Sequence, residues 1–465
     1  MGSGVARIGA PDPSQPASIT TPRPGWWRRA ARLLSGDTAR QGYLSAFDQA
    51  LISLTNFIAS VLLARAVTPT QFGAYGVGFL LLHLARAFQE GLIIQPMSAL
   101  AASMSDDVRR RYLTGSASLQ LVLALAGALA CALGGKVLTD LGNTVAGPTL
   151  FALWSPVLLA QVQEFLRRVL YVRGDVPLAV INTTVTSLAR VVFLTWVLAG
   201  GATSGTVGLA AIAWGGAAGL AVGAIQTRRL WVGRGAEVLG AWRRNWALGR
   251  WVLGGTTANW VAVEVFPILT AGLVSFAATG VYRAVQNVVA PVHALLRAMD
   301  TYFTPRLADR RQASGSTGVV DMVRRMFVVT GPAVAVILVG AVVFPDPLLR
   351  VLYGETYGGY GAAMRWMALF YACLYLYSPI QSALKAVQMT RPIFLGSAAA
   401  TLSMFTVGVW MILRWGVYGT IAGQALSAAI VAGVLWASWI GWRRSETARP
   451  VAARAAPPGE SRQGG

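Results

Sequence analysis

No charged side chain interrupts the sequence LQLVLALAGALACAL at residues 119–133. The same is true of residues 207–225 and 328–344. With their flanks, these stretches approach the roughly 20 apolar residues that a helix needs to cross the hydrocarbon core of a bilayer. The chain has 465 residues, is 55% hydrophobic and is only 12% charged, which is too apolar for a soluble protein of this size. The sequence therefore predicts an all-α membrane protein.

Apolar length and polar breaks divide the chain into about twelve transmembrane helices, six in each half. The predicted spans are residues 43–66, 72–97, 112–133, 149–172, 177–200 and 207–227, then 251–273, 277–303, 326–344, 361–384, 393–415 and 418–442. We expect two six-helix lobes around a central cavity, with disordered tails at both ends and a basic linker between the lobes. The predicted boundaries are 1–42 (tail), 43–227 (N-terminal lobe), 228–250 (linker), 251–442 (C-terminal lobe) and 443–465 (tail).

The formal net charge of +21 is explained by where Lys and Arg lie. They gather in alternate loops and near both chain ends, and the opposite loops hold only Arg65, Lys136, Arg350 and Arg414. Cytoplasmic loops carry an excess of Lys and Arg, so we expect an inner-membrane protein with both termini in the cytoplasm. This distribution favours anionic membrane lipids as partners and does not require nucleic acid. Residues 26–34, WWRRAARLL, form either a short helix on the membrane surface or a plain juxtamembrane linker.

Two similar triplets open corresponding spans of the two halves. Gly73-Ala74-Tyr75 opens the second span, and Gly280-Val281-Tyr282 opens the eighth. One such match is weak by itself. Together with six predicted spans in each half, it favours two lobes related as a parallel repeat.

The predicted span at residues 277–303 concentrates polar side chains on one face. At 3.6 residues per turn, a stripe roughly 140° wide holds Arg283, Gln286, Asn287, His293, Arg297 and Asp300. Charged groups at membrane depth usually face a protein interior or an aqueous cavity. We therefore expect the stripe to line the lumen and to bind a polyanionic substrate, because guanidinium offers paired donors to phosphate. The alternative is that Arg297 pairs with Asp300 at i,i+3 and only stabilises packing.

Charges in the first half give further candidates for substrate contact. Arg190 has no acidic residue within four positions on its helix, so we expect it to face the lumen. Arg86 shares a face with His83 and Glu90, and Arg86 and Glu90 have the i,i+4 spacing of a salt bridge. For Arg86, substrate contact and structural pairing remain equal alternatives.

Carboxylates inside predicted spans could carry H⁺ or Na⁺, the only cofactor that we expect. The candidates for ion coupling are Asp48, Glu264 and Glu90. Asp48 has the alternative role of a residue at the start of its helix, near the membrane interface. Glu164 and Arg168 have the i,i+4 spacing of a structural pair near a helix end.

No catalytic or metal-binding motif is present. The chain has two histidines, His83 and His293, and its two cysteines, Cys131 and Cys373, lie in apolar stretches. These residues cannot build a zinc site, and no P-loop occurs. The loops predicted on the periplasmic side of the membrane are too short to hold a polymerase or glycosyltransferase site. The sequence therefore predicts transport and no enzymatic activity.

Three stretches resemble a known family. They are LLARAVTPTQFGAY at residues 62–75, GVYRAVQN at 280–287 and LYGETY at 352–357. They are similar to the polysaccharide biosynthesis family of lipid-linked oligosaccharide flippases, which includes O-antigen flippase-like proteins. That family belongs to the multidrug/oligosaccharidyl-lipid/polysaccharide exporter superfamily.

The resemblance implies that two six-helix lobes alternate between inward-open and outward-open states. It also implies that they move an undecaprenyl-diphosphate-linked oligosaccharide to the outer leaflet, for O-antigen, lipopolysaccharide or exopolysaccharide assembly. A polysaccharide polymerase and a chain-length regulator would be its partners. The alternative is a cation-coupled, multidrug-type antiporter, although such relatives rely on acidic lumen residues and this chain has an excess of arginine.

Overall fold

The computed structural model describes residues 37–232 and 237–448. These ranges contain helices and no strand, as predicted. The first half comprises α2 (Asp37–Ala66), α3 (Pro69–Gln89), the π-helix η1 (Glu90–Ile94), α4 (Gln95–Ala101), α5 (Asp106–Asp140), α6 (Ala146–Ala152), α7 (Trp154–Val172), α8 (Val176–Ala199) and α9 (Thr206–Thr227). The second half comprises α10 (Val238–Leu273), α11 (Phe276–Val343), α12 (Pro345–Tyr353), the 3₁₀-helix η2 (Glu355–Tyr357), α13 (Gly361–Ala386), α14 (Arg391–Ser403), the π-helix η3 (Met404–Gly408) and α15 (Val409–Ala448).

Nine segments of the described chain are long and apolar enough to cross a membrane. One of them, Arg391–Glu446, holds two helices because the backbone turns at Gly416, where φ is 58°. α11 turns in the same way at Gly315, where φ is 59°, a conformation that glycine adopts without steric penalty. α10 and the part of α11 before Gly315 complete the set, and both are less apolar because they carry charges such as Glu264 and Arg283. The chain is a multi-pass membrane protein, and the prediction of about twelve spans is confirmed.

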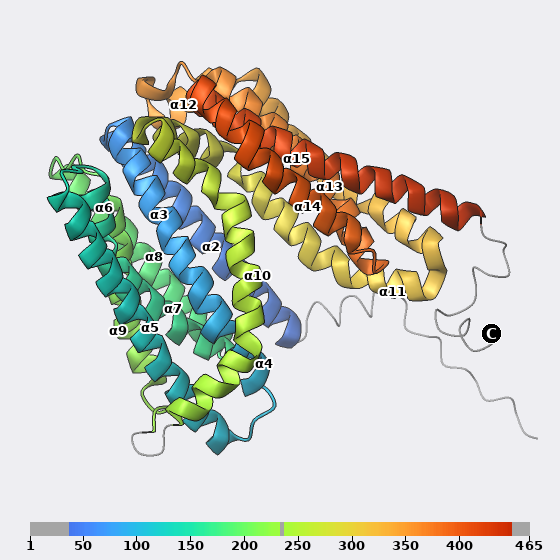
Figure 1. Cartoon of the computed structure of the whole chain (residues 1–465). Coiled ribbons are helices and arrows are strands. Elements are labelled where there is room, and N and C mark those ends of the chain that lie inside the picture. Colours follow the sequence, from blue (N-terminus) through green and yellow to red (C-terminus); the bar gives the residue numbers. More distant parts are fainter. Residues whose placement is uncertain (1–36, 233–236, 449–465) are drawn as a thin grey trace, which may run out of the picture.

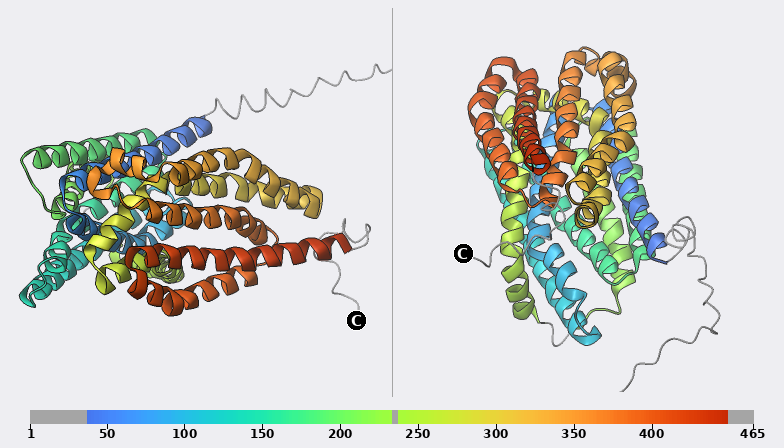
Figure 2. Two further views of the ribbon diagram at one scale, coloured as in Figure 1. Left: turned by 90° about the horizontal axis from the view of Figure 1, so that it is seen from above. Right: turned by 90° about the vertical axis from the view of Figure 1, so that its right-hand side faces the viewer.

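The two halves form two helix bundles (Figure 1). In the first half, α2 packs against α8, and α7 packs against α5 and α9. In the second half, α13 packs against α11 and α15, and α14 packs against α15. The bundles lie together where α12 is located and diverge toward the end where α2 begins and α15 ends (Figures 1 and 2). We name these the α12 end and the terminal end.

α10 connects the two bundles and contacts both. It packs against α3, α5 and η1 of the first half and against α11 and α15 of the second. Its first turns fall within the predicted linker at residues 228–250, of which residues 238–250 are helical. Tyr112 of α5 donates a hydrogen bond to Asn245 Oδ1 at 2.5 Å, and a Cβ at Gly249 would lie 2.6 Å from the carbonyl oxygen of Gly91. Residues 238–250 are thus a helical segment docked on the first half.

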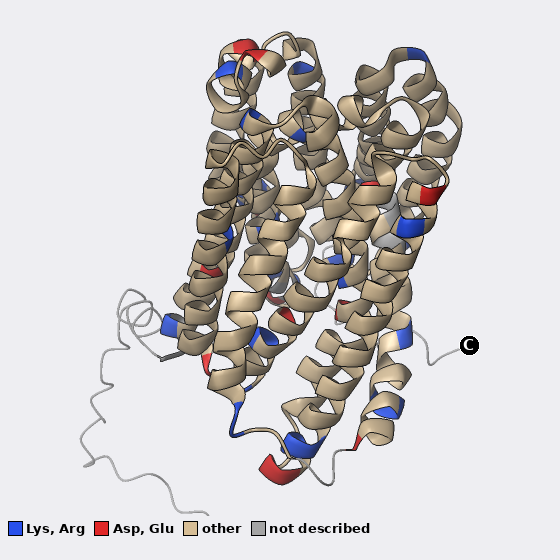
Figure 3. Ribbon diagram, turned by 90° about the vertical axis from the view of Figure 1, so that its left-hand side faces the viewer, with Lys and Arg blue, Asp and Glu red and all other residues tan. Residues whose placement is uncertain are grey.

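The ends of the described chain differ slightly from the predicted tails. α2 begins at Asp37, inside the predicted tail of residues 1–42, and α15 continues to Ala448, past the predicted boundary at 442. The predicted surface helix at residues 26–34 lies outside the described residues. Charged residues are sparse along the helices and leave most of the ribbon uncharged (Figure 3).

The positive-inside distribution predicts which end faces the cytoplasm. We expect reporter fusions after Arg111, Arg311 and Arg444 to give cytoplasmic signals, and fusions after Asn143 and Glu355 to give periplasmic signals. Paired phosphatase and fluorescent-protein reporters measure this directly. A periplasmic signal after Arg311 would remove one predicted span from the second half and would contradict the topology.

Candidate functional site

The two similar triplets, at residues 73–75 and 280–282, lie where α3 and α11 cross. Gly73 of α3 and Gly280 of α11 are in backbone contact. A Cβ at Gly73 would lie 1.7 Å from the carbonyl oxygen of Phe276, and a Cβ at Gly280 would lie 2.1 Å from that of Pro69. Phe276 lies one turn before Gly280 on α11, and Pro69 lies one turn before Gly73 on α3. Each glycine therefore packs against the turn that precedes the other glycine. This contact is reciprocal, as in an interface formed around a two-fold axis. Only glycine fits at this crossing, as at other close contacts between membrane helices.

Other contacts join the halves at the α12 end. Arg65, in the last turn of α2, donates from Nε to the carbonyl oxygen of Leu352 at 2.7 Å and from a second nitrogen to that of Val351. These carbonyls end α12, where the helix dipole places partial negative charge that suits a guanidinium. The Phe72 ring meets the Tyr357 ring edge-on, with 6.3 Å between their centroids. Two of the stretches that carry the family resemblance therefore contact each other.

Arg283 follows the crossing on α11 and is only 9% exposed. Gly76 of α3 leaves space for it, since a Cβ there would lie 2.9 Å from Arg283 Cγ. The guanidinium lies 5.0 Å from the centroid of the Phe79 ring and donates to Gln286 Oε1 at 3.1 Å, while its Nε has no hydrogen-bond partner. The aromatic face attracts the cation without neutralising it.

Arg190 of α8 contacts α3 within the first half and is 8% exposed. It donates to Asn56 Oδ1 at 2.6 Å and to the Tyr75 hydroxyl at 3.3 Å, and its Nε also has no partner. The rings of Tyr75 and Phe79 pack together with centroids 5.9 Å apart. Adjacent aromatic side chains of α3 therefore contact one arginine from each half, Arg190 and Arg283.

The next turns of α3 carry His83 and Arg86. The His83 ring packs on the Phe79 ring, with 4.4 Å between their centroids. Arg283 and Arg297 of α11 lie within electrostatic range of His83, and Arg190 lies within electrostatic range of Arg86. Arginines from α3, α8 and α11 are therefore gathered around α3. We name Arg86, Arg190, Arg283 and Arg297 the arginine cluster. Its members take part in none of the salt bridges found in the described part of the chain.

The predicted pairing of Arg86 with Glu90 is wrong. Glu90 begins the π-helix η1, in which the backbone N–H of Gln95 donates to the carbonyl oxygen of Glu90. None of the salt bridges found in the described part of the chain joins Glu90 to Arg86. The acid whose charge acts most strongly on Arg86 is Glu164 of α7. Glu90 therefore does not neutralise Arg86.

The polar stripe predicted on α11 faces two different neighbours. Asn287 donates to Ser60 Oγ of α2 at 2.6 Å and so joins the two halves. His293 instead meets Tyr371 of α13 edge-on, with 6.4 Å between the ring centroids. Asn287 thus lies at the interface with the first half, and His293 packs within the second half.

The alternative pairing of Arg297 with Asp300 is also wrong. Asp300 accepts hydrogen bonds from Ser382 at 2.6 Å and from Thr304 at 2.8 Å. Arg297 is exposed, and it lies within electrostatic range of Glu264 of α10 and of His83 of α3. Glu264 is half-buried, and it lies within electrostatic range of Arg283 and Arg297.

Asp48 is fully buried and already has a cationic partner. α2 begins at Asp37, so the interpretation of Asp48 as a residue at the helix start is wrong. Asp48 forms an ion pair with Arg167 of α7 and accepts a hydrogen bond from the Tyr171 hydroxyl at 2.7 Å. Arg167 also donates to both carboxylate oxygens of Glu164, at 2.9 and 2.7 Å. A guanidinium therefore stands where a coupling cation would bind Asp48.

Sequence reasoning assigned no pairing role to Arg167 and so missed this ion pair. The predicted pair of Glu164 with Arg168 is confirmed, at 2.8 Å. The i,i+3 spacing of Glu164 and Arg167 was the available signal for a larger network. The pairing of Arg167 with Asp48 could not be predicted from spacing, because Asp48 belongs to another helix, α2.

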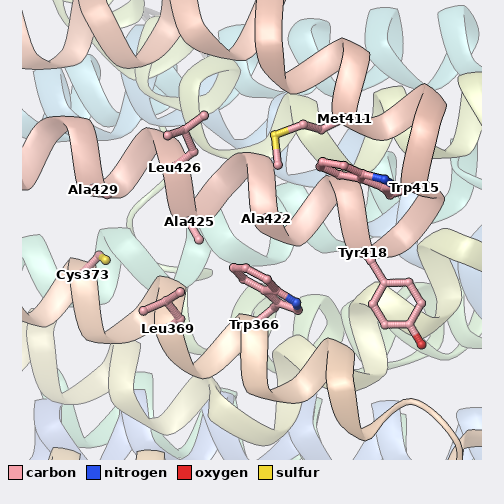
Figure 4. Close-up of a pocket in the computed structure, with 10 residues that line it drawn as sticks. All are labelled: Trp366, Leu369, Cys373, Met411, Trp415, Tyr418, Ala422, Ala425, Leu426 and Ala429. Carbon is pink, nitrogen blue, oxygen red and sulfur yellow. The ribbon is translucent and has the colours of Figure 1, made fainter.

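A groove on the second half is separate from the arginine cluster. α13 and α15 line it, with Trp366, Trp415 and Tyr418 near one end and Cys373 further along (Figure 4). Its lining contains no charged side chain. Tyr371, which packs on His293, lies about 200° around α13 from Cys373, so the groove and His293 lie on different faces of α13.

No protein-family model and no curated protein sequence matches the chain. Solved structures do. An inward-facing multidrug-resistance transporter of the MATE family and the MOP superfamily has a TM-score of 0.63 and 14% identity over 85% of this chain and 96% of that one. The lipid II flippase MurJ in an inward closed conformation has a TM-score of 0.62 and 13% identity over 86% and 87%. A MOP superfamily transporter from Pyrococcus furiosus has a TM-score of 0.57 and 14% identity over 90% and 98%.

Two joined helix bundles with charged residues between them define a polytopic membrane protein. More specifically, the chain has the fold of MOP superfamily transporters. Both multidrug transporters and a lipid flippase share this fold, so the fold leaves the substrate open.

We expect Gly73→Ala and Gly280→Ala each to keep the halves apart at the α12 end, because the new Cβ would overlap a backbone carbonyl. Disulfide cross-linking between cysteines at Phe72 and Tyr357 measures this closure, since these rings touch across the halves. The cross-link yield should fall severalfold in either glycine variant.

Cys131 and Cys373 are replaced by serine in all of these chains. Gly340→Ala is the matched control, because a Cβ added to this helical glycine of α11 would have nothing within 4 Å of it. It should leave the yield unchanged. Equal yields in the Gly73 and control variants would show that the crossing does not govern closure.

The ion pair of Asp48 with Arg167 should contribute to stability and not to coupling. Asp48→Asn leaves Arg167 without one of its two anionic partners and should destabilise the protein by about 3 kcal/mol. Adding Arg167→Gln to Asp48→Asn should cause less loss than the sum of the single changes, since the two groups interact. Thermal unfolding of the purified protein measures both effects. Additive losses, or stabilisation of the unaltered protein by Na⁺ that Asp48→Asn abolishes, would contradict the structural role.

Proposed function

We propose that this protein moves an undecaprenyl-diphosphate-linked oligosaccharide from the inner to the outer leaflet of the cytoplasmic membrane. The product would serve O-antigen or exopolysaccharide assembly and would pass to a polysaccharide polymerase and a chain-length regulator. The observation that carries the proposal is the arginine cluster between the halves, whose members lack salt-bridge partners in the described chain.

Unpaired arginine inside a membrane protein is energetically unfavourable, so a function should offset it. Arg190 and Arg283 are almost fully buried, and each leaves Nε without an acceptor. A diphosphate offers several oxygen atoms, which guanidinium groups bind through paired donors. Moving a diphosphate out of water costs several kcal/mol per charge, so cations along its path are required. The cluster supplies them from both halves.

The shape of the molecule supports alternating access. The halves are joined at the α12 end by the Gly73–Gly280 crossing and by Arg65, and they diverge at the terminal end. With the terminal end in the cytoplasm, this is a state that receives substrate from the inner leaflet. Release on the other side requires the α12 end to separate while the terminal end closes.

A cation-coupled antiporter of small molecules is the second candidate, and Glu264 is the observation that favours it. This carboxylate faces the arginine cluster and has no salt-bridge partner in the described chain. H⁺ or Na⁺ bound there could also drive a flippase. The two functions differ in what a deletion strain accumulates: lipid-linked repeat units for a flippase, and an unexported small molecule for an antiporter.

Substitutions at Arg190 and Arg283 test the proposal by complementation of a deletion strain. Gln at either position should lower surface polysaccharide roughly tenfold and Glu should abolish it, because a neutral group binds phosphate weakly and a carboxylate repels it. Lys should restore more function than Gln, since it keeps the charge but loses the paired donors. Surface polysaccharide and inner-leaflet lipid-linked intermediates are quantified and normalised to membrane abundance.

Arg365→Gln is the matched control. Arg365 is an exposed arginine of α13 that donates to the carbonyl oxygen of Val342, away from the cluster. It should support nearly normal polysaccharide. Wild-type levels from the Glu variants at Arg190 and Arg283 would exclude an anion path through the cluster.

A further inference from the structure

The first turns of α10 extend beyond the membrane-spanning part of that helix. α10 has 36 residues, which corresponds to about 54 Å of helix, whereas the hydrocarbon core is about 30 Å thick. Its first third therefore lies at the terminal end, where it packs against α4 and α5 (Figure 1). Because this segment continues directly into a span, its distance from the membrane surface is set by the helix itself.

This segment has one face docked on the protein and another facing outward. Ala241, Asn245 and Gly249, spaced four residues apart, are buried against the first half. Trp242 and Trp246 point outward and are 40% and 42% exposed. Their rings stack on each other with centroids 5.3 Å apart. Two large aromatic side chains thus form one exposed patch.

Exposed arginines lie beside the tryptophan patch. Arg243 and Arg250 are exposed and form none of the salt bridges found in the described chain. Arg250 lies 5.3 Å from the centroid of the Trp251 ring. Arg244 differs, because it is paired with Glu237 and lies 5.9 Å from the Tyr112 ring. Positive charge therefore remains available next to the patch.

We propose that this face of α10 is a binding site for anionic phospholipid headgroups of the leaflet at the terminal end. Trp242 and Trp246 insert at headgroup depth, where the amphipathic indole ring is favoured. Arg243 and Arg250 contact the lipid phosphates. Charge complementarity and continuity with the span select a lipid as the occupant. A soluble protein partner would have no reason to meet tryptophan at the depth of the membrane surface.

The test measures lipid binding to the full-length protein purified in detergent. Phosphatidylglycerol or phosphatidylcholine with the same acyl chains is titrated in, and bound lipids are counted by native mass spectrometry. We expect the unaltered protein to retain more phosphatidylglycerol. Arg243→Gln combined with Arg250→Gln should reduce this preference roughly fivefold per arginine removed. Trp242→Ala with Trp246→Ala should weaken binding of both lipids.

Two control variants make the result decisive. Arg324→Gln with Arg325→Gln removes the same charge from exposed arginines of α11 and should leave the preference intact. Arg243→Lys with Arg250→Lys keeps the charge and should retain most of the preference, which separates loss of charge from misfolding. Equal loss in the α10 and α11 variants would show a general charge effect and would overturn the proposal. Unchanged lipid binding in both α10 variants would overturn it too, and would leave the patch for a protein contact.

Discussion

The contact between Gly73 and Gly280 sets the position of the rest of the interface. Membrane helices approach this closely only where neither carries a side chain, because lipid provides no hydrophobic force that would compensate for a poor fit. Here each glycine lies against the backbone of the opposite helix, with 1.7 and 2.1 Å between a hypothetical Cβ and a carbonyl oxygen. The crossing brings α3 and α11 together, and with them Phe79 and Arg283. The arginine cluster forms around α3 as a result.

Charges inside the first half fall into two groups with different physical consequences. Asp48, Glu164 and Arg167 satisfy one another and hold α2 to α7. A network of this kind is destabilising to break, so its removal should lower the stability of the fold. Arg190 has only neutral partners, and its charge remains available to a ligand. The distinction between structural and functional charge therefore depends on which groups have an anionic partner.

α10 has contacts of a different kind along its length. At the terminal end it presents Trp242 and Trp246 outward, in its second half it carries Glu264 within electrostatic range of Arg283 and Arg297, and it packs on both bundles. In the alternating access proposed above, a helix with contacts to both halves moves relative to at least one of them. An anionic lipid bound to the first turns of α10 would then act on the helix that also carries Glu264.

The amino-acid sequence by itself determined the helical class and the approximate spans, because apolar length and helical period are local properties of the chain. It also identified Arg190 and Arg283 as unusual, since charge at membrane depth is visible without a structure. Spacing on one helix was less informative. Arg86 with Glu90 and Arg297 with Asp300 have suitable spacing and do not pair.

Only the tertiary structure decided the partners of these charges. Asp48 meets Arg167 across 119 positions of sequence, and the two similar triplets proved to be in contact as well as alike. Such pairings depend on how each helix is rotated and which neighbour it faces. Helical periodicity says which residues share a face, and only packing determines what that face meets.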